Sequence, residues 1–146
     1  MSNYLTGIKD SLAEGLGLSV GTAATVSAVN WIEVDSESLT TPKVYVAPGD
    51  MEFSRISRTQ SQVETSAIVF IGKKVSTDAE VEAATDLADQ IIGYIRAHDW
   101  ANEANWPEGI SSPTSITLEI NPDDGLNERN QWRAVANVSY THFVTD

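Results

Sequence analysis

Apolar and polar residues alternate through the second quarter of the chain, in the pattern of half-buried β-strands. In KVYVAP, residues 43–48, the valines face one way and the tyrosine and the alanine face the other. Pro48-Gly49-Asp50 then predicts a turn. Two further alternating arms follow, roughly Glu52 to Ser57 and Val63 to Lys73, and the second ends in the apolar run AIVFIG. The pattern therefore predicts a strand followed by a β-hairpin. The last residues of the second hairpin arm should be buried on both faces of the sheet.

The shared end of the two hairpin arms has little to bury. Arg55 to Glu64 hold two arginines, two glutamines and several hydroxyl side chains, but no Gly, Pro, Asn or Asp. Arms of ten residues reach roughly 30 Å, because a strand rises about 3.3 Å per residue. The tip, residues 58–62, should therefore project beyond the core that Phe53, Val69 and Ile71 supply. A two-stranded ribbon is marginal in water, so a projecting one indicates a partner, such as a neighbour in a ring. A hairpin without function stays open as the alternative.

Two segments have the 3.6-residue period of amphipathic helices. The first runs from Tyr4 to Leu16, and Gly15 and Gly17 predict its end. The second begins at Thr77 and Glu80, which form a Thr-x-x-Glu capping box. Its apolar stripe comprises Val81, Ala84, Leu87, Ala88, Ile91, Ile95 and His98. Both helices should therefore pack one face on a core.

The remaining segments complete the expected fold. A strand begins near Val26, Ala28 and Trp31, and TSITLEI and WRAVANVSYTHFV predict two strands joined by NPDDGLNERN, residues 121–130. The order of elements predicts an α+β domain over residues 1–146. We expect a mostly antiparallel sheet with a long projecting β-hairpin and two helices packed on one face.

Charge is distributed unevenly over the 146 residues. The net charge is −12, from 21 acidic and 9 basic side chains, which argues against sequence-independent nucleic-acid binding. Four cations, Arg55, Arg58, Lys73 and Lys74, belong to the hairpin, whereas Val75 to Glu128 contain twelve acids and one base. Two interpretations stay open. The acids form a solvated helix face, or the basic and acidic segments are complementary surfaces on copies of one protein.

Composition and the first residues narrow the class of protein. The chain has no cysteine, which excludes disulfides and thiolate metal sites and fits a reducing compartment. Residues 1–16 lack the basic start and apolar core of a signal peptide. No apolar run approaches the roughly 20 residues that span a bilayer. We therefore expect a cytoplasmic origin and no membrane partner.

Candidate chemistry is weak throughout. His98 and Asp99 are adjacent on a helix end and diverge, so His98 is expected to be a helix-end or core-edge residue. His142 alternates with Tyr140 and Val144 in the last strand and is expected to be structural. The oxygen-rich loop at 121–130 lacks the spacing of an EF-hand, and no nucleotide-binding glycine pattern occurs. We expect no catalytic residues, metal or cofactor, and Trp106 is the tryptophan most expected to make a contact outside the fold.

The succession AVNWIEVDSESL, PKVYVAP and EFSRISRTQSQVETSAIVFIGKK, then a capped helix and a final strand pair, resembles the small neck and tail-completion proteins of tailed bacteriophages. It is most similar to the tail terminator type. The likeness rests on the Val-x-Val-x-Pro strand, the Arg-x-x-Arg approach to the hairpin tip, and the alternating return strand that ends in lysines. It extends from Tyr4 to Val144, although Gly17 to Thr25 have no counterpart in it.

This resemblance implies a structural virion protein without catalysis, assembled in the host cytoplasm. Six copies would form a ring at the head-proximal end of the tail tube, with the tail tube protein and the head–tail connector as partners. DNA would pass through the lumen without specific binding, and an acidic bore would repel its phosphates. The implied subunit interface contains Arg55, Arg58, Gln60 and Gln62, with Glu82, Asp86 and Asp89 as the acidic counterpart. A head-closure or connector adaptor protein, and a small acidic cytoplasmic regulator that mimics DNA, are the alternatives.

Overall fold

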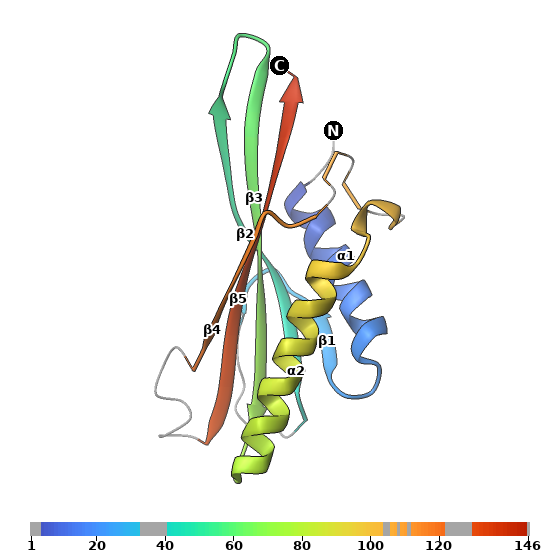
Figure 1. The fold of residues 1–146 in the computed structure, drawn as a ribbon, viewed down its shortest axis with the longest axis vertical. Coiled ribbons are helices and arrows are strands. Elements are labelled where there is room, and N and C mark those ends of the chain that lie inside the picture. Colours follow the sequence, from blue (N-terminus) through green and yellow to red (C-terminus); the bar gives the residue numbers. More distant parts are fainter. Residues whose placement is uncertain are drawn as a thin grey trace.

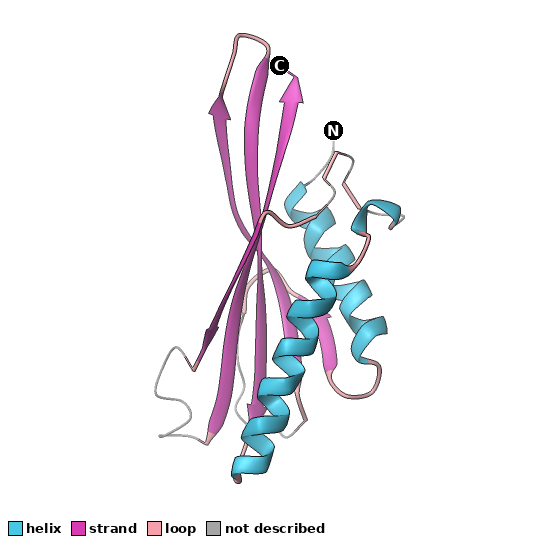
Figure 2. Ribbon diagram, in the orientation of Figure 1, coloured by secondary structure: helices cyan, strands magenta, loops and turns pink. Residues whose placement is uncertain are grey.

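A computed structural model of the chain describes residues 4–32, 41–103, 106–107, 109–110, 112–121 and 130–145. The elements in chain order are α1 (Tyr4–Val20), β1 (Thr25–Ala28), β2 (Lys43–Arg55), β3 (Gln60–Lys74), α2 (Asp78–Ala97), the 3₁₀ helix η2 (Trp100–Asn102), β4 (Ser115–Ile120) and β5 (Gln131–Thr145). The strands form one sheet in the order β1-β2-β3-β5-β4. Among the described strands, β1 and β2 alone pair in parallel. Both helices lie on one side of this sheet, which confirms the expected α+β architecture (Figures 1 and 2).

The core lies between the two helices and the half of the sheet that they cover. We call the covered face the helix side of the sheet and the other face the open side. Alternate residues of the three long strands point to the helix side, as the two-residue period requires. They meet apolar residues of α1 and α2 that are fully or almost fully buried. The buried residues of this core include Ile8, Leu12, Leu16, Val44, Val46, Val69, Ile71, Ala88, Ile91, Ile95, Ala134 and Ala136.

Helix α1 is longer than its glycines predicted. It continues through Gly15 and Gly17 to Val20, so the expected stop at these glycines was wrong. A β-carbon at Gly15 would lie 2.7 Å from the ring of Trp100, which means that the glycine lets the indole lie against the helix. The helix ends instead at Gly21, whose φ is +58° and whose N–H donates to the Gly17 carbonyl at 3.1 Å. This left-handed residue is a usual helix terminator.

Strand β2 does not turn at Pro48-Gly49-Asp50. It is one strand from Lys43 to Arg55, with a shift of register between Pro48 and Met51 opposite β3. The predicted turn is therefore a β-bulge. Ser66 of β3 stabilises it, because the Asp50 N–H donates to the Ser66 hydroxyl at 2.8 Å. The bulge bends the strand without ending it, so the hairpin continues the body of the sheet.

The projecting hairpin is not a two-stranded ribbon. Strand β5 pairs with β3 along its whole length, from Gln131 beside Lys74 to Thr145 beside Gln60. The last residues of the chain therefore lie alongside the hairpin almost to its tip (Figure 1). Two-stranded ribbons are marginal in water, and a third strand supplies the pairing that makes a sheet stable on its own.

The second helix and the last two strands agree with the sequence prediction. The Thr77 hydroxyl accepts a hydrogen bond from the Glu80 N–H at 3.2 Å, so the predicted cap is confirmed. Strands β4 and β5 are antiparallel neighbours. Of their predicted connection, residues 122–129 lie outside the described residues. Strand β1 ends at Ala28, so Trp31 lies beyond it.

Candidate assembly surfaces

The most exposed part of the described structure is the far end of the three long strands. We call it the arm and define it as residues 50–65 together with residues 140–145. It extends past the N-terminal end of α1 on the helix side of the sheet (Figure 1). Residues directly opposite in an antiparallel pair share a face. Phe53, Val63 and His142 form one such row on the helix side, whereas Gln62 and Phe143 lie on the open side.

The four predicted interface residues all lie on the arm but not on one face. Arg55 lies opposite Ser61 and shares the helix side with it. Gln60 and Gln62 belong to the open side, because they alternate with Ser61 along β3. Arg58 is in the turn between the strands, which is closed by hydrogen bonds from the Ile56 and Ser57 N–H groups to the Gln60 carbonyl at 3.1 and 3.2 Å. Residues 52–60 are all exposed.

The predicted acidic counterpart is a stripe on α2. Glu82, Asp86 and Asp89 are exposed and follow one another at spacings of four and three residues, so they share one side of the helix. This half of α2 lies at the end of the molecule opposite to the arm (Figure 1). The arm and the acidic stripe therefore do not meet within one copy of the chain.

An apolar groove lies beside this stripe, and no local pattern of residues predicted it. It has a volume of about 410 Å³. Helix α2 lines one side of it, and Ala23, Pro42 and Lys73 line the other. Its residues from α2 include Ala83, Asp86, Leu87 and Gln90. Lys73 forms an ion pair with Glu80 at 3.9 Å at its rim. The groove combines a mostly apolar floor with a carboxylate at its edge.

The open side of the arm carries a cluster of like charges. Glu52 lies directly opposite Glu64, and Asp50 is close by in a hollow of about 270 Å³ that Ser66, Asn137 and Ser139 also line. Like charges directly opposite in a sheet destabilise the pair. This part of the arm is therefore built at some cost in folding stability.

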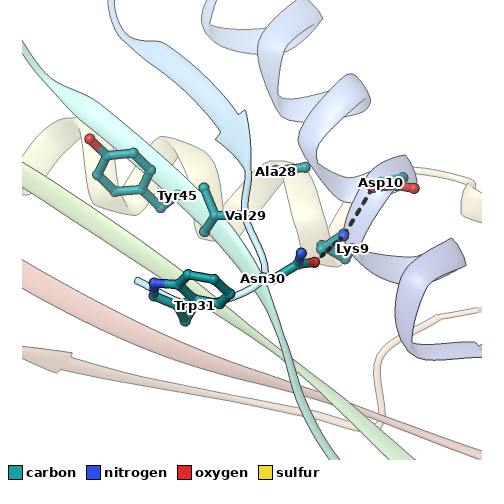
Figure 3. Close-up of a pocket in the computed structure, with 7 residues that line it drawn as sticks. All are labelled: Lys9, Asp10, Ala28, Val29, Asn30, Trp31 and Tyr45. Carbon is teal, nitrogen blue, oxygen red and sulfur yellow. Dashed lines mark hydrogen bonds and ion pairs between the residues drawn. The ribbon is translucent and has the colours of Figure 1, made fainter. Parts of the chain in front are cut away.

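Trp31, and not Trp106, is the tryptophan that faces solvent. Trp31 is 72% exposed and lies beside a hollow of about 460 Å³ with Tyr45 and Lys9 (Figure 3). The Lys9 ammonium donates to Asn30 Oδ1 at 3.2 Å and lies 3.6 Å from Asp10 Oδ1.

The expectation that Trp106 contacts a partner was wrong. Its indole is 8% exposed and stacks on Trp100 with ring centroids 5.2 Å apart. Its Nε1–H donates to the Ile110 carbonyl at 2.6 Å. Tyr140 contacts its other side, with centroids 5.4 Å apart. Trp106 is therefore part of an aromatic cluster that closes the core between the helices and β5.

The two histidines have the surroundings of core-edge residues. His98 caps α2, with its N–H donating to the Tyr94 carbonyl at 2.9 Å and its Nε2 lying 2.6 Å from Glu103 Oε1. His142 is buried against the ring of Tyr4, with centroids 4.3 Å apart, and burial lowers the pKa of its imidazole. Within the part of the chain that the structure describes, no group of three or more His, Cys, Asp or Glu is placed to hold a metal ion. None of the described helices is long and apolar enough to cross a membrane.

Neither a family model nor a curated protein sequence matches the chain. Among solved structures, the fold is similar to a chain of the "Virion of native gene transfer agent (GTA) particle". The two chains are 14% identical, the match covers 99% of this chain and 100% of that one, and the TM-score is 0.49. At this identity the similarity is one of chain path alone.

Proposed function

We propose that the chain is a structural virion protein of a tailed phage. In this proposal it forms a ring of six copies at the head-proximal end of the tail tube. The ring ends tail polymerisation and joins the tail to the head connector. The protein is assembled in the host cytoplasm and resides in the neck of the virion. No catalytic role and no cofactor belong to this function.

The observation that carries the proposal is the arm. It is a three-stranded sheet that projects past the helices, with Phe53 and Phe143 about 60% exposed on its two faces. Apolar side chains on a projecting sheet are an aggregation hazard unless a partner covers them. A neighbouring copy is the partner that the sequence resemblance implies. Head-to-tail contacts of this kind form a ring when the rotation from each copy to the next adds up to a full turn.

Charge supports the same arrangement. The arm carries Arg55 and Arg58 at its end, and the acidic stripe of α2 lies at the other end of the molecule. Complementary patches at opposite ends favour contact between copies and disfavour other registers. The net charge of −12 also suits a channel through which DNA passes, since negative charge repels phosphates.

The proposal is tested by disrupting the gene in a phage that encodes this chain and imaging the lysate by negative-stain electron microscopy. Overlong or irregular tails that are not attached to heads are the expected result, reversed by a plasmid-borne wild-type copy. Normal tails beside heads that have lost their DNA would assign the chain to head closure instead. Intact infectious particles would overturn both virion roles and favour the acidic regulator.

A variant tests the arm in the same assay. Arg58→Glu should fail to complement the disruption, although the purified variant keeps the circular dichroism spectrum and melting temperature of the wild type, because Arg58 is exposed in the turn. Glu14→Arg, on the exposed face of α1, serves as the matched charge reversal. Full complementation by Arg58→Glu would contradict a role of the tip in assembly. Native mass spectrometry of the particles' neck complexes then counts the copies.

A further inference from the structure

We propose that the apolar groove beside the acidic stripe of α2 is the socket for the hairpin tip of a second copy of this chain. In this contact Ile56 fills the apolar part of the groove and Arg58 pairs with Asp86. The inference rests on the proposed ring assembly and deepens it, because it names the surface that receives the arm. It also identifies which of the predicted acids contacts the tip.

The chemistry of the tip matches that of the groove. Residues 53–63 contain two arginines and no acid, and Ile56 is 51% exposed although it is a large apolar residue. The groove has a floor made mostly of Ala83, Ala84 and Leu87, and the carboxylate of Asp86 lies on its lining. The tip has an apolar side chain, Ile56, two positions before Arg58, so it can contact both the apolar floor and the carboxylate.

The size of the groove is also suitable. Its volume of about 410 Å³ falls in the range of roughly 300–1,000 Å³ in which protein pockets hold compact ligands. The turn from Ile56 to Gln60 is narrow, because two N–H groups share the Gln60 carbonyl. The aliphatic stem of an arginine can lie along apolar surface while its guanidinium reaches a carboxylate at the rim.

Asp86 is the acid of the stripe that is best placed to bind a cation from outside. Glu80 is already paired with Lys73, and Glu82 and Asp89 do not line the groove. Among the described residues, no cation lies within ion-pair distance of Asp86. A guanidinium that is brought against Asp86 in a partly dry groove would form a stronger, charge-assisted contact than it does in water.

The occupant must be another copy and not the same one. The tip and the groove lie at opposite ends of the molecule, and the tip is joined to the sheet by strands paired along their whole length (Figure 1). The tip therefore cannot fold back onto its own α2. When each tip lies in the groove of the next copy, the contact is heterologous, and such contacts form a ring where the rotation between copies closes.

Cross-linking tests the contact directly. Because the chain has no cysteine of its own, any disulfide between copies must form between the introduced cysteines. Ile56→Cys combined with Ala83→Cys is expressed from a plasmid in the disrupted phage, and purified particles are oxidised and separated on a non-reducing gel. The expected result is a ladder of multiples of the chain that ends at the copy number of the ring. Each single variant, and Ile56→Cys with Ala97→Cys, should give no ladder. Ala97 is exposed and lies about 21 Å further along α2.

The outcomes separate the socket from the function. Particles that form normally with the Ile56→Cys/Ala83→Cys variant but give no ladder would overturn the socket and leave the ring role intact. A disruption that has no effect on tails or heads would overturn the proposed function itself. A ladder from the Ala97 control as strong as from Ala83 would also overturn the assignment, since it would mean that the tip touches α2 without specificity.

A charge exchange covers the case in which the cysteine pair prevents assembly. Arg58→Glu and Asp86→Arg should each lower the yield of infectious particles by about tenfold or more, because each leaves two like charges facing each other in the contact. The double variant should restore the yield to within about threefold of the wild type. Arg58→Glu combined with Glu14→Arg should stay low. A double variant that folds, judged by its melting temperature, but restores nothing would overturn the Arg58–Asp86 contact.

Discussion

The same three strands build the helix-covered body of the sheet and the bare arm. In the body, β2, β3 and β5 contribute Val46, Val69 and Ala136, which are completely buried under α1 and α2. In the arm, the same strands expose Phe53 and Phe143. The hydrogen-bonded ladder between β3 and β5 continues through both regions without a break. Apart from the bulge in β2, the two regions therefore differ in what covers them and not in how their backbones pair.

This difference shows how a short chain can present a rigid projection. The register of the body fixes that of the arm, because a slip by one residue would turn every core side chain outward. The base of the arm is still covered: Val63 of β3 and Tyr140 of β5 are completely buried, and Ser61 and His142 are nearly so. Residues 52–60 are exposed, so the tip is available for contact.

The largest predicted effect breaks the body. Trp100→Ala should lower the free energy of unfolding by about 3–5 kcal/mol, the usual cost of removing a large buried aromatic side chain. The indole is completely buried, lies against Gly15, and donates to the Ile95 carbonyl at 2.9 Å. Urea denaturation followed by circular dichroism measures the change. One cooperative transition is expected, since the arm depends on the body; a second transition that the substitution leaves unmoved would mean that the arm folds by itself.

A paired substitution in the arm gives the next effect. Val63→Ala should cost about 1–2 kcal/mol, because it removes two buried carbon atoms at about 0.8 kcal/mol each. Phe53→Ala, directly opposite it, should change stability by less than about 0.5 kcal/mol, as surface substitutions usually do. If the proposed contact between copies involves the exposed Phe53, the same variants should rank the other way in the complementation assay. Equal stability losses for both would mean that Phe53 already packs within one copy.

These contrasts also show which parts of the fold the sequence could predict. The capped helix α2 and the alternating arms depend on local periods and caps, which neighbouring residues determine. The extents of α1 and β2 depend on contacts far along the chain. Gly15 stays helical because Trp100 lies against it, and Gly49 lies within a strand because Ser66 O is 2.9 Å from where its β-carbon would be. A glycine predicts an interruption locally, and only the tertiary partner shows that it permits close approach instead.

The candidate surfaces divide in the same way. Composition identified the arginines and glutamines of the tip, because an alternating hairpin without turn residues is visible in one segment. The partner strand of the arm was missed, since the pairing of β5 with β3 joins residues 57 to 85 positions apart. The groove was missed for a similar reason, because Ala23, Pro42 and Ala83 come from three separate segments. The burial of Trp106 was missed because it depends on ring contacts with Trp100 and Tyr140, which come from other elements of the fold.

The boundary between body and arm should be sensitive to acid. His142, at the base of the arm, is buried against Tyr4 of α1, and burial lowers the pKa of its imidazole from the usual 6.5. The folded state therefore disfavours the protonated ring, so stability is complete above about pH 6.5 and falls as the pH drops below it. The effect near neutral pH is smaller than that of Val63→Ala, because most of the imidazole is unprotonated there.

Melting temperatures between pH 7.5 and 5.0 measure this dependence. His142→Phe keeps an aromatic ring against Tyr4 and should flatten the curve over that range. His98→Gln, at the solvent-facing end of α2, is the matched control and should keep the fall attributable to His142. Identical curves for the wild type and His142→Phe would show that the boundary opens enough to hydrate the imidazole without cost.

The smallest predicted effect comes from removing a repulsion between two carboxylates in the arm. Glu52 lies directly opposite Glu64 on the open side of the arm. Glu52→Gln should raise the free energy of unfolding by a few tenths of a kcal/mol, within the range of about 0.2–1 kcal/mol for cross-strand pairs. The gain should shrink as salt rises, since the Debye length is about 10 Å at 0.1 M. Glu119→Gln, whose cross-strand partner is the uncharged Val135, should give no gain. Urea titrations at low and high salt compare the two variants. If the free energy of unfolding of Glu52→Gln does not rise at low salt, the two carboxylates lie too far apart in the arm to repel each other.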